Sequence, residues 1–327
     1  MALAARWVIR VAAAACAGRA AGRVGGAFVV GGGAFVVEAP AISTVNATVS
    51  AASAAGAGGP AGMAYDEAAA VSAFGLAEAS YCEIEAWNCT TCAAGVRDVV
   101  VISDDGSSGG RAIVGYDTRD DTVFVAFRGT ENIRNWLKNV EFAKTYPYND
   151  TALGVEVGFY GWYAALLKNG LATALAQAAA KAGTTSVKAT GHSAGGACAT
   201  LLAYDLLVGA LPGLEDLQLK QHYTFGSPRV GNAAFAADFG AKISAASVPS
   251  FRITHFHDIV PQVPPEASYY HHVAQEVWYD EFFTNRTECD GSGEDPNCSD
   301  SCYLTLLCDD VSDHMSYMNS SAGIAGC

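Results

Sequence analysis

The chain has 327 residues, of which 51% are hydrophobic, and this is enough for one large core or at most two small ones. Its formal net charge is −14, and no cluster of Lys and Arg interrupts the acidic balance, so nucleic acid is not expected as a partner. The same charge disfavours binding to strongly anionic membranes, although net charge says little about one local patch.

Residues 1–60 differ in composition from the rest of the chain. Four arginines accompany an alanine-rich lead-in, an apolar run without charge covers 24–37, and Ala39-Pro40-Ala41 follows it. Basic, then apolar, then small residues are typical of a secretory signal, so we predict a signal region over about 1–41 and a folded domain over 61–327. The apolar run is too short to span a bilayer comfortably. An organelle-targeting peptide and a low-complexity tail are the alternatives.

Cysteines and glycosylation sequons also favour export. Eight of the ten cysteines form two groups, namely Cys82, Cys89 and Cys92, then Cys289, Cys298, Cys302, Cys308 and Cys327. Eight cysteines can pair completely, and disulfides belong to oxidising compartments. Cys89-x-x-Cys92 also has the spacing of zinc ligands, but no second pair follows.

Sequons of the form N-x-S/T stand at Asn46, Asn88, Asn149, Asn285, Asn297 and Asn319. We therefore expect a secreted, disulfide-bonded glycoprotein, with Cys198 as a buried free thiol.

Predicted strands and helices alternate along the domain. From the N-terminus we expect a helix over 65–81, strands over 96–102, 112–116 and 122–127, and a helix over 158–183. A strand over 187–190, a helix over 195–208, and strands over 222–225, 251–256 and 273–279 follow. This alternation predicts an α/β fold whose largely parallel central sheet is flanked by helices. The Cys- and Asp-rich segment 285–310 is expected to be a stapled surface loop.

The strand over 122–127 leads into Gly129 and Thr130, which could supply an oxyanion donor. Thr130 offers a backbone N–H and a side-chain O–H together, or it caps the next helix, or both. In that helix Ile133, Trp136, Leu137 and Val140 fall at i, i+3, i+4 and i+7. Such a stripe usually packs into a core. This helix, however, directly follows the strand over 122–127 and the candidate oxyanion donor. That position favours a lid, which would cover the active site in water and turn its apolar face to lipid.

The segment 191–195, of the form G-x-S-x-G, lies between a predicted strand and a predicted helix. A serine on such a turn exposes its hydroxyl, which makes Ser193 the predicted nucleophile. The N–H of Ala194 is at the start of a helix, where it can stabilise a developing oxyanion. A second match to the motif contains Ser108, but it lies in a polar hairpin turn with no helix after it.

A serine nucleophile needs a base, and in this type of fold the partners follow in the order Ser, acid, His. Asp258 comes after a strand that cannot continue past Pro261, which makes it the predicted acid; a loop-capping aspartate is the alternative. His314 comes late in the chain and is the predicted base, with His271 and His272 as rivals. Asp258 would orient the imidazole, and His314 would relay the proton from Ser193 to the leaving alkoxide.

These residues together resemble the fungal-type class 3 triacylglycerol lipases. The resembling segments are 79–82, 125–130, 133–137, 190–197, 223–232, 252–265, 270–279 and 313–317. The resemblance implies an α/β-hydrolase fold, a Ser193–Asp258–His314 triad, oxyanion donors at Thr130 and Ala194, and a lid near 131–142. It also implies that Cys82 pairs with Cys327. The family usually has Leu where this chain has Ala194, and often Ser where it has Thr130.

The sequence thus predicts a secreted serine carboxylic-ester hydrolase, a lipase that cleaves acylglycerol esters through an acyl-enzyme on Ser193. The expected partner is neutral lipid at an oil–water or membrane interface. No metal, cofactor or obligate protein partner is expected. A feruloyl-esterase-like activity and a phospholipase A1 or galactolipase activity are the alternative enzymes, and a non-catalytic binding glycoprotein is the alternative of another class.

Overall fold

The computed structural model describes residues 64–84, 87–104, 109–140, 142–302, 308, 310–323 and 327. The predicted signal region, the sequon at Asn46 and the alternative serine Ser108 lie outside these residues. No helix among the described residues is both long enough and apolar enough to cross a membrane.

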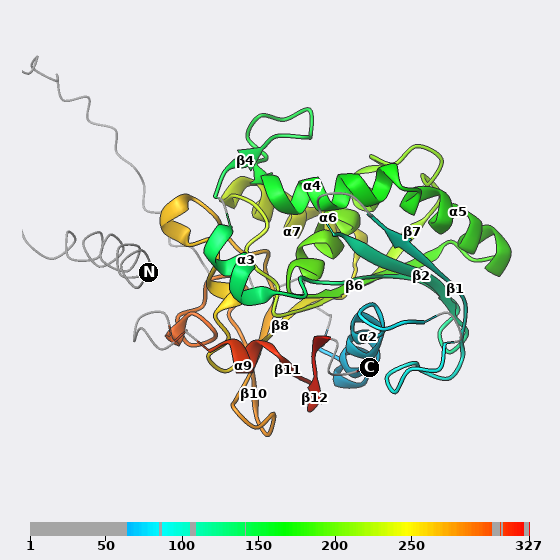
Figure 1. The fold of residues 1–327 in the computed structure, drawn as a ribbon. Coiled ribbons are helices and arrows are strands. Elements are labelled where there is room, and N and C mark those ends of the chain that lie inside the picture. Colours follow the sequence, from blue (N-terminus) through cyan, green and yellow to red (C-terminus); the bar gives the residue numbers. More distant parts are fainter. Residues whose placement is uncertain are drawn as a thin grey trace, which may run out of the picture. The chain divides into compact units, whose positions relative to one another are not determined.

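An eight-stranded sheet forms the centre, in the order β1-β2-β3-β6-β7-β8-β9-β10 (Figure 1). Its strands are β1 (Val96–Ser103), β2 (Arg111–Asp117), β3 (Thr122–Phe127), β6 (Ser186–His192), β7 (Gln218–Phe225), β8 (Ser250–His255), β9 (Glu276–Tyr279) and β10 (Arg286–Glu288). From β3 to β9 the neighbouring strands are parallel, whereas β1, β2 and β10 add antiparallel edges. The predicted α/β fold with a largely parallel sheet is therefore confirmed.

Helices cover both faces of this sheet. On one face lies α2 (Glu67–Ala79), against β6 and β7. The other helices named here are α4 (Val157–Lys168), α5 (Leu171–Ala182), α6 (Ala194–Val208) and α7 (Ala233–Ala246), and Figure 1 shows α4, α5 and α6 on the side away from α2. Every residue of β3 and of β8 is buried, as expected for strands in a sheet that is covered on both sides.

Several predicted elements differ in their bounds from those observed, and β7, for example, begins at Gln218, four residues before the predicted strand. The single helix expected over 158–183 is two helices, because the chain turns at Gly170, whose φ of 101° lies in the left-handed region. The last predicted strand begins three residues late, at Glu276, after Gln275 with a φ of 66°. Apolar residues keep helical spacing on both sides of Gly170, so the pattern did not reveal that break.

Short elements complete the fold around the ends of the parallel strands. They are α3 (Ile133–Asn139), β4 (Lys144–Thr145), β5 (Val155–Glu156), η2 (Val260–Gln262), η3 (Glu266–Ser268), α9 (Val311–His314), β11 (Ser316–Tyr317) and β12 (Ser320–Ser321). Of these, α3 follows β3 directly, and α9 carries His314 as its last residue.

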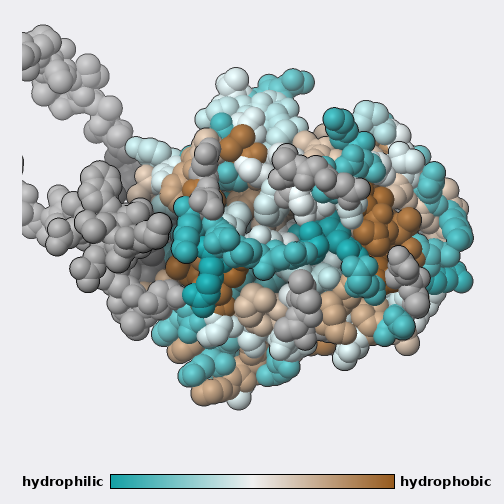
Figure 2. Space-filling model, in the orientation of Figure 1, coloured by the Kyte–Doolittle hydropathy of each residue, from teal (hydrophilic) through white to brown (hydrophobic). Residues whose placement is uncertain are grey.

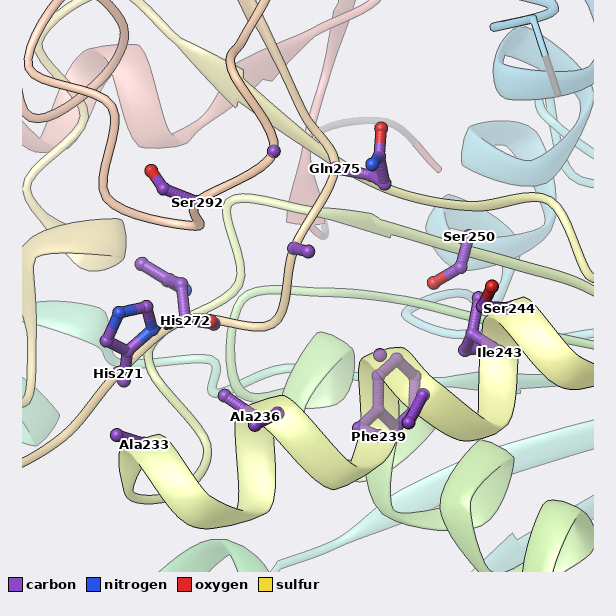
Figure 3. Close-up of a pocket in the computed structure, with 15 residues that line it drawn as sticks. Ala233, Ala236, Phe239, Ile243, Ser244, Ser250, His271, His272, Gln275 and Ser292 are labelled. Carbon is purple, nitrogen blue, oxygen red and sulfur yellow. Dashed lines mark hydrogen bonds between the residues drawn. The ribbon is translucent and has the colours of Figure 1, made fainter. Parts of the chain in front are cut away.

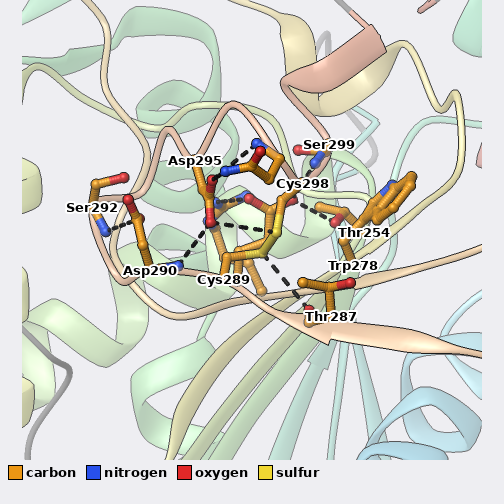
Figure 4. Close-up of a disulfide and its surroundings, with 12 residues drawn as sticks. Thr254, Trp278, Thr287, Cys289, Asp290, Ser292, Asp295, Cys298 and Ser299 are labelled. Atoms are coloured by element: carbon orange, nitrogen blue, oxygen red, sulfur yellow. Dashed lines mark hydrogen bonds and ion pairs between the residues drawn. A yellow bond between two sulfur atoms is a disulfide. The ribbon is translucent and has the colours of Figure 1, made fainter.

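Among the described residues, four disulfides are formed. They are Cys82–Cys327, Cys89–Cys92, Cys289–Cys298 and Cys302–Cys308. The first joins residues 245 positions apart and is the pairing that the family resemblance implies. Because Cys89 and Cys92 are joined to each other, the zinc alternative for this pair is wrong. Figure 4 shows the Cys289–Cys298 bridge, with Thr287 and Asp295 beside it. Cys198 is the buried free thiol that was expected, and burial raises its pKa to about 12.

Candidate active site

Ser193 lies on the sharp turn between β6 and α6. Its φ of 60° and ψ of −136° are strained for a residue other than glycine, which is the backbone geometry of a nucleophile elbow. The flanking glycines make this turn possible. A Cβ on Gly191 would lie 2.3 Å from the carbonyl oxygen of Gly195, and one on Gly195 would lie 2.2 Å from that of Phe127. Strand, turn and helix thus approach too closely for any side chain at these two positions.

Asp258 and His314 form a buried pair beside this turn. Asp258 follows β8, and its Oδ2 lies 2.9 Å from Nδ1 of His314. The same oxygen accepts a hydrogen bond of 2.6 Å from the Tyr317 hydroxyl, and Oδ1 accepts one of 2.8 Å from the N–H of Val260. Burial and the nearby Asp258 raise the pKa of Tyr317 well above 10, so this hydroxyl keeps its proton and donates. Because the carboxylate can only accept, the Nδ1–H of His314 donates to it, and Nε2 is the ring nitrogen left for another partner.

Ser193 and His314, the predicted nucleophile and base, each have one polar side-chain atom without a hydrogen-bond partner among the described residues. Ser193 and His314 are both 1% exposed, and neither Oγ of Ser193 nor Nε2 of His314 has a hydrogen-bond partner among the described residues. A buried polar atom without a partner is costly and calls for an explanation, and a catalytic role is one such explanation. Gly226, with a φ of 54°, backs the acid–base pair, since a Cβ there would lie 2.8 Å from Oδ2 of Asp258 and 3.0 Å from Nδ1 of His314.

The turn after β3 lies directly against the elbow. A Cβ on Gly129 would lie 2.7 Å from Cβ of Ser193 and 2.6 Å from the carbonyl oxygen of His192. Thr130 follows, and its Oγ1 accepts a hydrogen bond of 3.3 Å from the N–H of Asn132. The N-cap of α3 is Asn132 rather than Thr130, so the capping alternative for Thr130 is wrong. The Thr130 hydroxyl proton stays available, and the N–H of Ala194 lies in the first turn of α6, where helix donors lack intrahelical partners.

The predicted lid forms a helix, α3, that is one residue shorter than its apolar stripe. Ile133 is buried, and Trp136 stacks on Phe159 of α4 with ring centroids 5.8 Å apart. Leu137 is half-buried, and Val140 is the C-cap, with extended backbone. Figure 2 shows mainly hydrophilic side chains across the region where α3 lies in Figure 1, with hydrophobic ones in separate groups. The apolar side of α3 is therefore turned inward in this conformation.

The rival histidines lie elsewhere. Nε2 of His272 is 2.7 Å from the carbonyl oxygen of Pro261, and burial together with the charges of Arg252 and Arg229 holds its pKa well below 6.5. His271 lies at one end of a groove of about 420 Å³ between α7 and the segment before β9 (Figure 3). None of the predicted triad residues lines this groove.

The sequence missed two residues that contact the site. Sequence reasoning placed His192 and Tyr81 only inside resembling segments, yet the two are hydrogen-bonded to each other, with 2.9 Å between Nδ1 and the hydroxyl. The ring of His192 stacks on that of His314, with centroids 4.5 Å apart. No periodicity or spacing signals such a contact, because the residues come from three distant segments. Their presence inside the family-like segments 79–82 and 190–197 was the available hint.

Within the described part of the chain, two groups of side chains have the spacing to hold a metal ion. In the first, Glu276 lies beside Cys289 and Cys298, but these sulfurs are joined in a disulfide. In the second, Glu266, Glu294 and Asp300 lie together, but the Arg229 guanidinium binds two of them, at 2.6 Å to Glu294 and 3.3 Å to Asp300. An arginine therefore already supplies the positive charge there. No contact among the described residues joins either group to Ser193.

Comparison with known proteins gives a consistent family. The model of the family Lipase (class 3) matches residues 124–268. A lipase of Rhizomucor miehei is 30% identical over 256 residues, which are 76% of this chain and 68% of that protein. A secreted mono- and diacylglycerol lipase of Penicillium camembertii is 33% identical over 165 residues, or 50% of each chain. The chain therefore spans about half the length of that relative.

Solved structures show the same fold. Lipase II of Rhizopus niveus superposes with a TM-score of 0.67 at 27% identity, and the match covers 79% of this chain and 96% of that one. A triacylglycerol lipase whose catalytic centre is described as a serine protease triad superposes with a TM-score of 0.67 at 29% identity, with the same coverage.

Proposed function

The chain belongs to the class 3 lipase family, and we propose that it is a secreted lipase that hydrolyses acylglycerol esters through an acyl-enzyme on Ser193. The observation that carries the proposal is that Oγ of Ser193 and Nε2 of His314 are both buried without a hydrogen-bond partner among the described residues, while Nδ1 of the same histidine is bonded to Asp258. A hydroxyl and a basic nitrogen arranged in this way are the reacting groups of a serine hydrolase.

In the first half-reaction Ser193 is the nucleophile. Its Oγ bonds to the ester carbonyl carbon as its proton passes to Nε2 of His314. The carbonyl oxygen becomes an oxyanion, which the N–H of Ala194 and the N–H and O–H of Thr130 would stabilise. The tetrahedral intermediate collapses when the C–O bond to the glyceride breaks and His314 returns the proton to the leaving alkoxide.

In the second half-reaction water takes the place of the hydroxyl. His314 removes a proton from water as the water oxygen bonds to the acyl carbon, and the proton is then returned to Oγ of Ser193 as the fatty acid leaves. Throughout, Asp258 holds the imidazole in the required tautomer and stabilises the imidazolium. Tyr317 and the N–H of Val260 hold Asp258 in place by their hydrogen bonds.

Access to Ser193 requires a movement, because both reacting groups are buried. We infer that α3 is the lid: it follows the oxyanion turn, it is short, and one aromatic stack fixes Trp136 to Phe159. At a lipid surface the apolar side chains of α3 could exchange this contact for lipid, which favours the open form. The expected partner is therefore neutral lipid at an interface.

Secretion is supported by the four disulfides and by relatives that are named secreted lipases. The sequons at Asn149 and Asn285 lie on exposed loops, which suits glycosylation along the same route. We propose that the domain begins near residue 61 and that the segment before it directs export.

The deciding experiment measures hydrolysis of tributyrin below and above its solubility limit, with Ser193→Ala as the control. We expect wild-type activity to jump when droplets form and the variant to lose activity by several orders of magnitude. Near-normal activity of Ser193→Ala would reject the proposal. A panel of triacyl-, diacyl-, phospho- and galactolipids with a soluble feruloyl ester separates the alternatives: a smooth concentration dependence with preference for the feruloyl ester would favour that esterase activity. Failure of a fluorophosphonate to label Ser193 would favour a binding protein.

A further inference from the structure

A chain of three hydrogen bonds connects the oxyanion turn to the segment that carries His314. The N–H of Gly129 donates to the Tyr81 hydroxyl at 3.0 Å, and this hydroxyl lies 2.9 Å from Nδ1 of His192. On the other side of the ring, Nε2 of His192 lies 2.9 Å from the carbonyl oxygen of His314. Through the two buried side chains, the oxyanion turn is thus joined to the segment just after α2, to β6 and to α9.

The direction of every bond in this chain is determined. Burial and the neighbouring His314 hold the pKa of His192 well below 6.5, so its ring is neutral and carries one proton. A carbonyl oxygen only accepts, which places that proton on Nε2 and leaves Nδ1 as an acceptor. The Tyr81 hydroxyl, whose pKa is raised by burial, therefore donates to Nδ1 and accepts from Gly129.

The geometry leaves little freedom at the Gly129 end. A Cβ on Gly129 would lie only 2.5 Å from the Tyr81 hydroxyl oxygen and 2.7 Å from Cβ of Ser193. The hydroxyl thus occupies the space that a side chain on Gly129 would take, between the oxyanion turn and the nucleophile. At the other end, the ring of His192 stacks on the ring of His314 at 4.5 Å.

We propose that Tyr81 and His192 are positioning residues that fix the oxyanion turn and the general base relative to Ser193. This inference rests on the proposed roles of Ser193 and His314. The hydroxyl of Tyr81 sets where the Gly129–Thr130 peptide lies, and Nε2 of His192 sets where the backbone of His314 lies. His192 directly precedes Ser193 in the chain. Its contacts with Tyr81 and with His314 therefore set the positions of both partners relative to the nucleophile. Misplacement of reacting groups by about 1 Å can cost on the order of 100-fold in rate.

The test compares two tyrosine-to-phenylalanine variants on a soluble short-chain ester, so that no lipid surface is involved. Tyr81→Phe removes the shared hydroxyl and keeps the ring. Tyr163→Phe is the matched control, because its buried hydroxyl donates to Asp205 at 2.8 Å, away from Ser193. We expect Tyr81→Phe to lower kcat by about 10- to 100-fold with KM changed less than about twofold, and Tyr163→Phe to lower only the melting temperature.

A double-mutant cycle then asks whether the two residues act as one unit. His192→Phe removes both ring nitrogens and keeps a flat ring against His314. If the hydrogen bonds form one connection, the double variant with Tyr81→Phe loses no more kcat than the worse single variant. The rate of fluorophosphonate labelling of Ser193 should fall in parallel with kcat, since it needs the same base and oxyanion donors.

Three results would overturn the proposal: kcat of Tyr81→Phe within twofold of wild type, losses that multiply in the double variant, or a loss in Tyr163→Phe equal to that in Tyr81→Phe. Each is separable from failure of the proposed function. An inactive Ser193→Ala combined with a normal Tyr81→Phe removes only the positioning role, whereas an active Ser193→Ala removes the function.

Discussion

Glu78 allows the cost of a buried carboxyl to be measured directly. It lies in α2 with 1% of its surface exposed, and no basic side chain among the described residues forms an ion pair with it. Burial raises its pKa to about 8. The N–H of Gly323 and the hydroxyl of Ser320 lower the pKa, but neither lies in hydrogen-bonding geometry with the carboxyl oxygens, so burial dominates.

The sign of the pH dependence follows from the two pKa values. An unfolded glutamate has a pKa of 4.5, so above that pH the unfolded chain releases the proton while the folded chain keeps it on Glu78. The free energy of unfolding therefore falls as the pH rises from about 4.5 to about 8, and this contribution is constant above that range. At about 1.4 kcal/mol per pH unit, the interval corresponds to about 5 kcal/mol, and water penetration lowers the expected effect to about 3–5 kcal/mol.

Glu78→Gln removes the ionisation and nearly preserves the shape. We compare the free energy of unfolding of the variant with that of the wild type at each pH. Between pH 4.5 and pH 9, this difference should shift by about 3–5 kcal/mol in favour of the variant. The measurement is urea denaturation at pH 4.5, 6, 7.5 and 9 with disulfides intact. Glu83→Gln is the control, because that side chain is 90% exposed and the variant removes one negative charge from the surface instead of the interior. Parallel curves for Glu78→Gln and wild type would refute the reasoning.

Three further substitutions test the site. Asp258→Asn should lower kcat on the order of 10⁴-fold, because the amide favours the wrong tautomer of His314. The measurement is steady-state kinetics on a soluble ester, and a loss of kcat below tenfold would contradict the prediction. Gly129→Ala places a Cβ within 2.7 Å of three atoms, so the turn must shift and kcat should fall about 100-fold or more. A variant with wild-type activity and stability would show instead that the turn can move freely. Trp136→Ala removes the stack on Phe159 that, under the proposed lid role of α3, holds the closed form. Hydrolysis of a soluble ester should then rise about 2- to 10-fold, and the jump at droplet formation should shrink. An unchanged jump would argue against α3 as the lid.

The fold and the site were open to sequence reasoning to different degrees, for physical reasons. Strands such as β3 were predictable because Thr122–Phe127 is a β-branched and aromatic run that both faces of the sheet bury. The elbow at Ser193 was predictable because its glycines are imposed by backbone contacts of 2.2–2.3 Å, which leave a mark in the sequence. Asp258 and His314 were predictable from their order along the chain and from the family-like segments around them.

The remaining features depend on contacts that leave no local pattern. Nothing near Tyr81 indicates that its hydroxyl meets His192, because the partner lies 111 residues away. The break at Gly170 was missed because apolar residues keep helical spacing on both sides of it. The pairing of the cysteines other than Cys82 and Cys327 could not be read from spacing, since loop geometry decides which thiols meet.

The stacked pair of histidines shows why burial matters to the chemistry. During the proposed reaction His314 takes a proton and becomes a cation, 4.5 Å from the ring of His192. A second imidazolium at that distance would oppose the first, and the repulsion would raise the barrier to proton transfer from Ser193. Burial prevents this, because it holds the pKa of His192 well below 6.5. The single proton that His192 retains is already used toward the carbonyl oxygen of His314. One histidine can therefore cycle its charge only because the other is held neutral, and a basic side chain introduced beside His192 should slow acylation without touching the triad.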